Sequence, residues 1–283
     1  MVLSVFSGCL EAGVEDAAMV PTSLLWEFNT SGFIISSPFA TEGGVYFGSG
    51  DKRLYVVSPA TGDLTWSFDT GGPIYSSPFV ADGVVYFGSH DEHLYALNSV
   101  DGGVLWSVRT DGPVYATPAV EGGTVYFAST DNNLYAVDKE SGVVKWRFKT
   151  GALIVTSPLV VDDLVVIGSC DDNVYGVDRV SGREVWRVET GGAVVSSPTY
   201  SDGIIYVGSH DHFLYAIDAE SGEVLWKFET DSYVQSSPVV NGDLVIFGSD
   251  DGSIYAVDKQ GGALVWSFQA DEMVFTSPLV HKG

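Results

Sequence analysis

The stretch Tyr215–Trp226, YAIDAESGEVLW, carries the pattern that decides the fold. An alternating apolar run ends at Asp218, the polar segment AESG follows, and a second apolar run leads to a tryptophan. Two β-prone runs around a short turn of small and polar residues predict a β-hairpin. Close copies of this stretch occur every 40 residues, so the hairpin belongs to a repeated unit.

Tryptophan, proline, tyrosine and aspartate all recur with this 40-residue spacing. Each proline follows Ser, or Thr at position 117, and each tyrosine lies four residues after its aspartate. Several series in one register indicate a repeat protein, and we expect the tryptophans to be core residues of each repeat. The series are Trp26, Trp66, Trp106, Trp146, Trp186, Trp226 and Trp266; Pro38, Pro78, Pro118, Pro158, Pro198, Pro238 and Pro278; Tyr55, Tyr95, Tyr135, Tyr175, Tyr215 and Tyr255; and Asp51, Asp91, Asp131, Asp171, Asp211 and Asp251.

One repeat, residues 193–229, divides into four short β-type runs separated by turn residues. The runs are 193–200, 203–209, 213–218 and 223–229. No segment keeps a helical period over about ten residues, so we expect no helices. A four-stranded antiparallel unit of this length is typical of a β-propeller blade. The sequence therefore predicts an all-β propeller.

The number of runs indicates how the propeller closes. The first and fourth runs occur seven times, whereas clear second and third runs occur six times. We therefore expect seven blades, the last closed by residues 273–280 and 24–29, with degenerate second and third strands from residues 4–20. The alternative is a fragment of a longer repeat array. We assign residues 22–283 to the propeller and residues 1–21 to an N-terminal segment.

The N-terminal segment has a second interpretation. Residues 5–9, VFSGC, resemble the end of a lipoprotein signal, in which the cysteine is lipidated after cleavage. Only eight residues precede Cys9, too few for a basic region and a full apolar region. Lipidation of Cys9 and degenerate strands of the closing blade therefore stand as alternatives. Cys170 is the only other cysteine, so no disulfide framework is expected.

The charge of the chain excludes one class of partner. There are 37 acidic and 13 basic side chains, for a formal net charge of −24. A surface of this sign repels nucleic-acid phosphates, so we expect no nucleic-acid binding. Such a chain is either an ordinary acidic protein or one from a halophile, in which concentrated salt screens the self-repulsion. No run of 18 apolar residues occurs, so no transmembrane span is expected.

The interval from alanine to tryptophan within Tyr215–Trp226 resembles the PQQ-like (pyrroloquinoline quinone) propeller repeat, whose signature reads Ala-x-Asp, then Thr/Ser-Gly, then Trp. Six repeats match it nearly completely, with Val56 and Gly176 in place of the alanine in two of them. The resemblance covers nearly everything from residue 24 to residue 280. It implies the scaffold found in quinoprotein dehydrogenases and in BamB-type outer-membrane assembly lipoproteins.

The resemblance does not extend to the cofactor site of the dehydrogenases. Those enzymes are similar in blade architecture but have eight blades, a vicinal cysteine pair over the quinone, and Glu, Asn and Asp residues around a calcium ion. This sequence has no adjacent cysteines and no inserted loops between repeats. We therefore expect no cofactor, since neither pyrroloquinoline quinone nor Ca²⁺ is supported.

Two tripeptides, Ser89-His90-Asp91 and Ser209-His210-Asp211, contain the residue types of a nucleophilic triad. The same turn reads Ser129-Thr130-Asp131 in another repeat, and adjacent residues on one turn cannot form the serial hydrogen bonds of a triad. Acidic turns such as 171–173 and 250–252 do not continue as a calcium loop. The histidines that would have to meet in a zinc site lie up to three repeats apart. We expect no catalytic and no metal site; these histidines are His90, His93, His210 and His212.

The repeats differ most in the turns between the second and third strands and at the start of the first strand. The structural constraints of the scaffold are the same in every blade, so positions that differ between blades are the ones at which a binding site could have evolved. Neutral variation on a surface without function would produce a similar pattern. Aromatic residues near a charged rim are typical of a partner surface. We predict that this side of the propeller binds a protein partner or small ligand through Tyr75, Tyr115, Tyr233, Gln235, Phe275, His90, His210 and His212.

The sequence thus favours a non-catalytic binding or scaffold propeller that acts as a monomer outside the cytoplasm. Its location would be the cell surface or a periplasm-like space, with Cys9 as the candidate lipid anchor. One alternative is a quinone-dependent or other small-molecule oxidoreductase that uses the axial pocket of the propeller. Another is a sensor module of a longer chain.

Overall fold

A computed structural model describes residues 2–6 and 24–280 of the chain. Its elements are all β-strands, and six four-stranded antiparallel sheets form the blades of a β-propeller. The all-β propeller is therefore confirmed, and the six sheets together with one two-stranded sheet agree with about seven blades. The chain divides into two compact units, Met1–Ser107 and Val108–Gly283.

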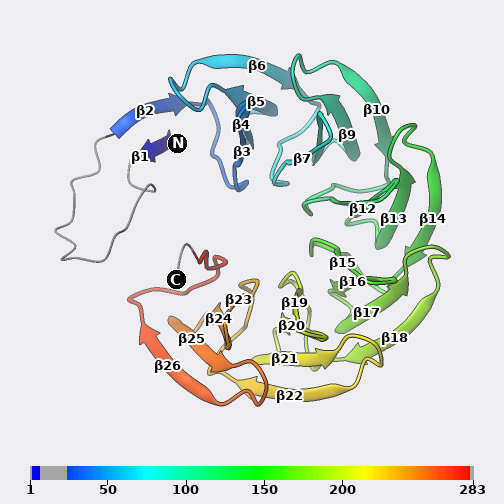
Figure 1. Cartoon of the computed structure of the whole chain (residues 1–283), viewed down its shortest axis with the longest axis vertical. Helices are drawn as coiled ribbons and strands as arrows, with labels where there is room; N and C mark the ends of the chain where they lie inside the picture. Colours follow the sequence, from blue (N-terminus) through cyan, green and yellow to red (C-terminus); the bar gives the residue numbers. More distant parts are fainter. Residues whose placement is uncertain (1, 7–23, 281–283) are drawn as a thin grey trace. The chain divides into compact units, whose positions relative to one another are not determined.

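Each blade uses four consecutive strands in sequence order (Figure 1). The first two sheets consist of β3 (Phe39–Thr41), β4 (Gly44–Gly48), β5 (Arg53–Val57) and β6 (Leu64–Asp69), and of β7 (Phe79–Ala81), β8 (Val84–Gly88), β9 (His93–Asn98) and β10 (Val104–Arg109). The second unit contains β11 (Ala119–Glu121), β12 (Thr124–Ala128), β13 (Asn133–Asp138) and β14 (Val144–Lys149); β15 (Leu159–Val161), β16 (Leu164–Ser169), β17 (Asn173–Asp178) and β18 (Glu184–Glu189); β19 (Thr199–Ser201), β20 (Ile204–Gly208), β21 (Phe213–Asp218) and β22 (Val224–Glu229); and β23 (Val239–Asn241), β24 (Leu244–Gly248), β25 (Ser253–Asp258) and β26 (Leu264–Gln269).

The first strand of each blade is shorter than the sequence suggested. Residues 193–200 were expected to form it, but β19 covers Thr199–Ser201. Pro198 has no N–H to donate to a ladder, so regular pairing begins only after the proline. The expected strand at 273–280 is likewise not observed. In this repeat the positions that follow the proline begin at Leu279 and extend past the described residues.

The second and third strands form the core of each blade. They are buried along their length, as in β20, whereas fourth strands such as β18 alternate between exposed and buried positions. Each hydrophobic cluster joins two consecutive sheets: Val166 of β16, for example, packs in one cluster with Ile205 and Tyr215 of the next blade. In the second unit β15, β19 and β23 lie on the inner side and β18, β22 and β26 on the outer side (Figure 1). Sheets with both faces covered explain the nearly continuous apolar runs of the sequence.

The repeated tryptophans pack one blade against the next. The indole Nε1 of Trp186 donates a hydrogen bond of 3.0 Å to the carbonyl oxygen of Ala219, 33 residues later, in the turn before the fourth strand of the following blade. Trp26, Trp66, Trp146 and Trp226 make the same bond at the same interval. Trp266 differs, because it is 41% exposed.

The Ser-Pro pairs form a second series of links between blades. The N–H of Ser157 donates to Oγ of Ser197, and the N–H of Ser197 donates to Oγ of Ser237, each at 2.9 Å. Each bond spans one repeat. Because the following proline has no N–H, the serine before it supplies the backbone donor at this point, so the 40-residue series of Ser-Pro pairs corresponds to one such bond per blade.

The strand β1 (Val2–Phe6) pairs with β2 (Leu24–Asn29) in an antiparallel ladder. Val5 faces Trp26, and the register shifts after Val5, just as Val56 faces Trp66 with a shift after Val56. β1 therefore has the register of a third strand. The 40-residue offset had instead aligned residues 5–8 with a second strand, because more residues separate β1 from β2 in the sequence than separate β5 from β6. Residues 7–23, including Cys9, lie outside the described part of the chain.

Candidate partner-binding surface

The turn between the second and third strands of each blade, called here the aspartate turn, is built around the repeated Asp. In one such turn Asp91 Oδ2 accepts hydrogen bonds from the Tyr95 hydroxyl at 2.8 Å and from the N–H of Gly71 at 2.7 Å. Gly71 lies 20 residues earlier, in the link that enters the blade. The aspartate thus fixes the entry link against the third strand. The same pair of bonds occurs at Asp51, Asp131, Asp171, Asp211 and Asp251.

The tyrosines of these turns make the fold sensitive to alkali. Burial, and then the hydrogen bond to the aspartate, raise the pKa of Tyr95 and Tyr215 above the usual value of 10.0. The folded state therefore holds these protons at a pH where the unfolded chain releases them, so the stability is full below about pH 10 and is lost as the pH rises toward the folded-state pKa. We expect the thermal midpoint to fall steeply above about pH 10. A midpoint that is unchanged up to about pH 12 would contradict this expectation.

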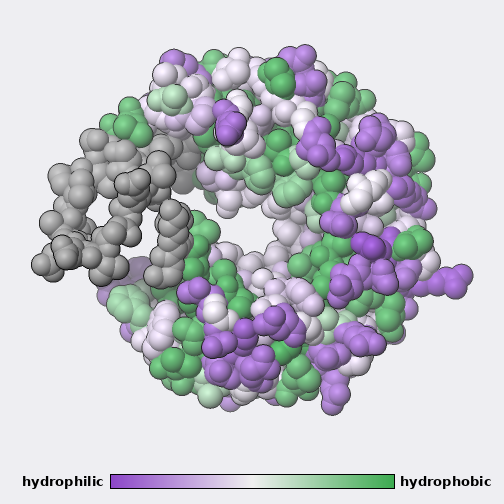
Figure 2. Space-filling view, in the orientation of Figure 1, coloured by the Kyte–Doolittle hydropathy of each residue, from purple (hydrophilic) through white to green (hydrophobic). Residues whose placement is uncertain are grey.

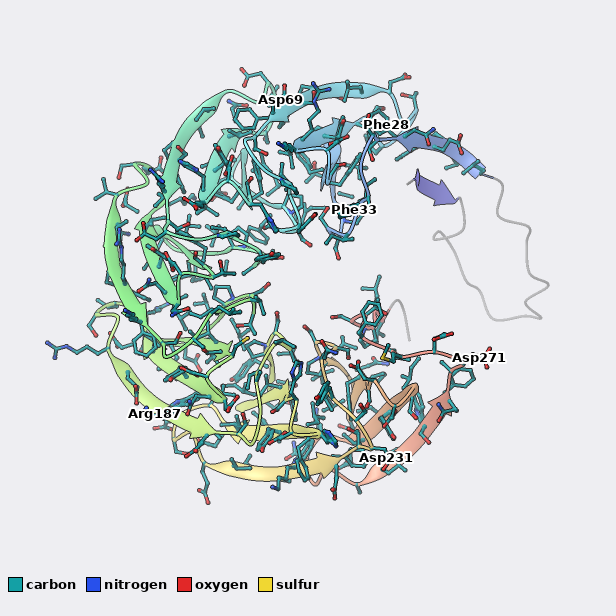
Figure 3. All side chains as sticks on the ribbon, turned by 180° about the vertical axis from the view of Figure 1, so that it is seen from behind. Phe28, Phe33, Asp69, Arg187, Asp231 and Asp271 are labelled. Atoms are coloured by element: carbon teal, nitrogen blue, oxygen red, sulfur yellow. The ribbon has the colours of Figure 1, made fainter. Side chains whose placement is uncertain are left out.

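In the first unit an aromatic group lies beside the aspartate turns. Phe33 is 51% exposed and stacks on Tyr75 with ring centroids 5.5 Å apart. Tyr75 in turn meets the edge of the His90 ring at 4.4 Å. Figure 3 places Phe33 on the inner side of this unit and Asp69 on its outer strand. Two of the predicted residues, Tyr75 and His90, are thus brought together.

A second aromatic group lies beside the aspartate turns of the second unit. Tyr233 is 43% exposed, stacks on His210 at 4.5 Å and contacts His212 at 5.6 Å. Within the described part of the chain, His210 Nε2 is buried and has no hydrogen-bond partner. Gln235 is held in place because its amide donates to the carboxylate of Asp250. The structure thus joins three of the predicted residues in one group and ties Gln235 to a partner that the sequence did not reveal.

The remaining predicted residues of the second unit are exposed. Phe275 is 62% exposed, and Tyr115 also reaches solvent. Sequence reasoning missed Ile35 and Leu153, two exposed apolar residues at the repeat positions of Tyr75 and Tyr233. An alignment of the seven repeats by 40 residues would have identified both positions. We use the term aromatic rim for the corresponding residues of each unit taken by itself: Phe33, Tyr75 and His90 in the first unit, and Tyr115, His210, His212, Tyr233 and Phe275 in the second.

The residues of the Ser-His-Asp tripeptide at 209–211 have separate structural partners. The Ser209 hydroxyl donates to the carbonyl of Gly192, the His210 ring stacks on Tyr233, and the Asp211 carboxylate accepts from Tyr215. They form no serial hydrogen-bond chain. Among the described residues there is no cluster of three or more His, Cys, Asp or Glu side chains that could hold a metal ion, and no helix that could cross a membrane.

Comparisons with known proteins agree with this architecture. The family model described as the β-propeller of the beta-alanine-activating enzyme matches residues 13–203, and the model described as outer membrane protein assembly factor BamB matches residues 170–281. A search of curated protein sequences finds no significant match. Among solved structures, BamB from Moraxella catarrhalis superposes with a TM-score of 0.82 over 92% of this chain and 83% of that one, at 20% identity. At this level of identity, the superposition shows that the two proteins share a fold.

Proposed function

The chain belongs to the PQQ-like β-propeller family, and we propose that it is a non-catalytic propeller that binds a protein partner through its aromatic rim. The observation that carries the proposal is the exposure of large aromatic side chains where the repeats depart from one another. Tyr233 and Phe275 are examples, at 43% and 62% exposure. The scaffold does not require them, because other blades have Ala193 and Val195 at the corresponding positions.

The chemistry of the rim suits a protein surface. Aromatic residues are enriched at the centres of protein interfaces, where a few of them supply most of the binding energy. The stacks of Phe33 on Tyr75 and of Tyr233 on His210 hold these rings in place before binding, which reduces the entropy lost on association. Because the chain carries a formal charge of −24, a partner with a basic surface would be attracted over a long range.

We further propose that the protein acts outside the cytoplasm. Lipidation of Cys9 after cleavage would remove β1 (Val2–Phe6), which pairs with β2, so the lipid anchor and the paired strand are alternatives. The support for this location is the match of residues 170–281 to the BamB model together with the VFSGC sequence at 5–9. Metabolic labelling with a fatty acid, compared between the wild type and Cys9→Ser, tests the anchor. Labelling that persists in the variant would contradict it.

The rim is tested by a matched pair of double variants. Tyr75→Ala with Tyr115→Ala is expected to lower partner capture by at least about tenfold, because hot-spot truncations typically cost about 2 kcal/mol or more each. The control, Glu121→Ala with Asp202→Ala, changes the opposite end of the blades and should leave capture unchanged. Circular dichroism should show both variants folded. Equal losses in the two variants, or a loss in the control alone, would overturn the assignment.

A second candidate function is a propeller domain within a longer enzyme. It is favoured by the match of residues 13–203 to the propeller of the beta-alanine-activating enzyme. The coding sequence on both sides of this chain distinguishes the two. A continuous reading frame into a catalytic domain would favour the second candidate, and a stop codon after residue 283 with a signal sequence upstream would favour the first.

A further inference from the structure

The second unit contains a pocket at the end of the blades opposite the aspartate turns. It lies between the sheet β15–β18 and the sheet β19–β22 and has a volume of about 530 Å³, within the range of small-molecule sites. Five carboxylates line it, together with the exposed ring of Tyr200 and the side chain of Val185. The acidic residues are Asp162, Asp163, Asp178, Asp218 and Glu220. Figure 2 shows hydrophilic residues gathered over these blades on one face of the second unit.

The equivalent position one blade later is filled by a lysine of the chain itself. Lys259 Nζ lies 2.9 Å from the carboxylate of Asp202 and 3.5 Å from that of Asp243, and it donates to the carbonyl of Gly242 at 2.9 Å. The Lys259 side chain is only 13% exposed. Asp202 lies 40 residues after Asp162, so the same carboxylate position that holds this ammonium group also lines the pocket.

The equivalent position one blade earlier is also occupied by a cation. Lys145 Nζ donates to the carbonyl of Gly123 at 2.7 Å and to Thr124 Oγ1 at 2.9 Å, and it lies 3.4 Å from Asp138. Asp138 is the repeat equivalent of Asp178 in the pocket. Two neighbouring copies of this site therefore bind ammonium groups through carboxylates that the pocket retains.

The pocket has lost both of the lysines that its neighbours use. Ala219 stands at the position of Lys259, and Val185 stands at the position of Lys145. Arg179 reaches one of the five carboxylates, Asp163, at 3.5 Å. Hydrogen bonds from Ser181 and Ser221 lower the pKa of Asp178 and of Asp218, so these groups are ionised at neutral pH.

The charge of the pocket is not a requirement of the fold. The equivalent pocket of the first unit, between β3–β6 and β7–β10, has a volume of about 430 Å³ and is lined by uncharged residues. Thr41, Ser99 and Val100 stand there in place of Val161, Ala219 and Glu220. The same backbone geometry therefore forms with or without carboxylates at these positions.

We propose that this pocket binds primary ammonium groups, as carried by a free aliphatic polyamine or by a lysine side chain of a partner protein. Its carboxylates pair with the ammonium, the apolar faces of Val185 and Ala219 accept methylene groups, and the Tyr200 ring is available for a cation–π contact. The proposal is independent of the aromatic rim, which lies at the other end of the blades.

Calorimetric titration of the full chain with spermidine, and separately with Nα-acetyl-lysine methylamide, tests the proposal. The wild type should bind at least one probe at a saturable single site, and the probe that binds identifies the source of the ammonium group. Ala219→Lys places an ammonium group where Lys259 has one and should weaken binding by about 100-fold or more. Ser99→Lys adds the same charge at the equivalent position of the uncharged pocket and should leave the affinity within about twofold.

A third variant keeps the test valid if Ala219→Lys does not fold. Asp162→Asn removes one carboxylate without changing the volume of the side chain and should weaken binding by about tenfold. The proposal is overturned if the wild type shows no saturable site for either probe. It is also overturned if Ala219→Lys and Ser99→Lys weaken binding equally, because the probe would then respond only to the net charge, or if Asp162→Asn leaves the affinity unchanged.

Discussion

Replacement of Trp186 by alanine is expected to lower the free energy of unfolding by about 3–5 kcal/mol. The indole is 7% exposed, belongs to a cluster that joins two consecutive blades, and donates through Nε1 to the carbonyl of Ala219. The substitution removes this packing, leaves a cavity between two sheets and leaves the carbonyl without its donor. Denaturant unfolding monitored by circular dichroism measures the loss.

Trp266→Ala is the matched control, because Trp266 has the same place in the repeat but is 41% exposed. Less apolar area leaves contact with the protein there, so the loss should be about 1–2 kcal/mol. Equal losses at the two positions would contradict the interpretation of the tryptophans as contacts between blades. A loss below about 1 kcal/mol for Trp186→Ala would contradict it directly.

Replacement of Gly182 by alanine is expected to cost about 2–4 kcal/mol, although it adds a single methyl group. Gly182 has a φ of +69°, and a Cβ atom there would lie 2.6 Å from Cδ2 of Trp146. Two costs therefore combine: the left-handed backbone, which L-residues adopt at about 1–2 kcal/mol, and the overlap with the indole ring. The thermal midpoint and the denaturant midpoint measure their sum.

Gly122→Ala separates the two costs. Gly122 has a φ of +56°, but a Cβ atom there would meet nothing within 4 Å. This variant should lose about 1 kcal/mol, from the backbone term alone. If Gly122→Ala costs as much as Gly182→Ala, the packing of glycine on the tryptophan of the preceding blade contributes nothing, and the proposed reason for the repeated glycine is wrong.

The blade architecture was predictable because it follows from a local periodicity. Three of the strands expected in residues 193–229 match the observed β20, β21 and β22 within one residue at each end. They are 203–209, 213–218 and 223–229. The first strand was predicted too long, because its apolar residues suggested a ladder that the proline interrupts. The long separations in sequence between Trp186 and Ala219, or between Ser157 and Ser197, required the structure, since they depend on how one sheet faces the next.

The candidate sites were less predictable than the fold. The sequence identified Tyr233 and His210 as departures from the repeat, but not that their rings stack or that Gln235 binds Asp250. The acidic pocket left a trace in the sequence, since Ala219 aligns with Lys259. The significance of this difference required the structure, which shows the Lys259 salt bridges, because a lysine on a turn is ordinarily a solvated residue.

Site-specific photocrosslinking tests the central claim, that the aromatic rim binds a protein partner, most directly. A photoreactive amino acid replaces Tyr115 on the rim in one variant and Leu225 on the outer strand β22 in a matched variant, since both side chains are exposed. We predict one discrete crosslinked species from position 115, which disappears when Tyr233→Ala, in the same unit, is added, and none from position 225. Crosslinking of equal yield at both positions, or at position 225 alone, would contradict the account.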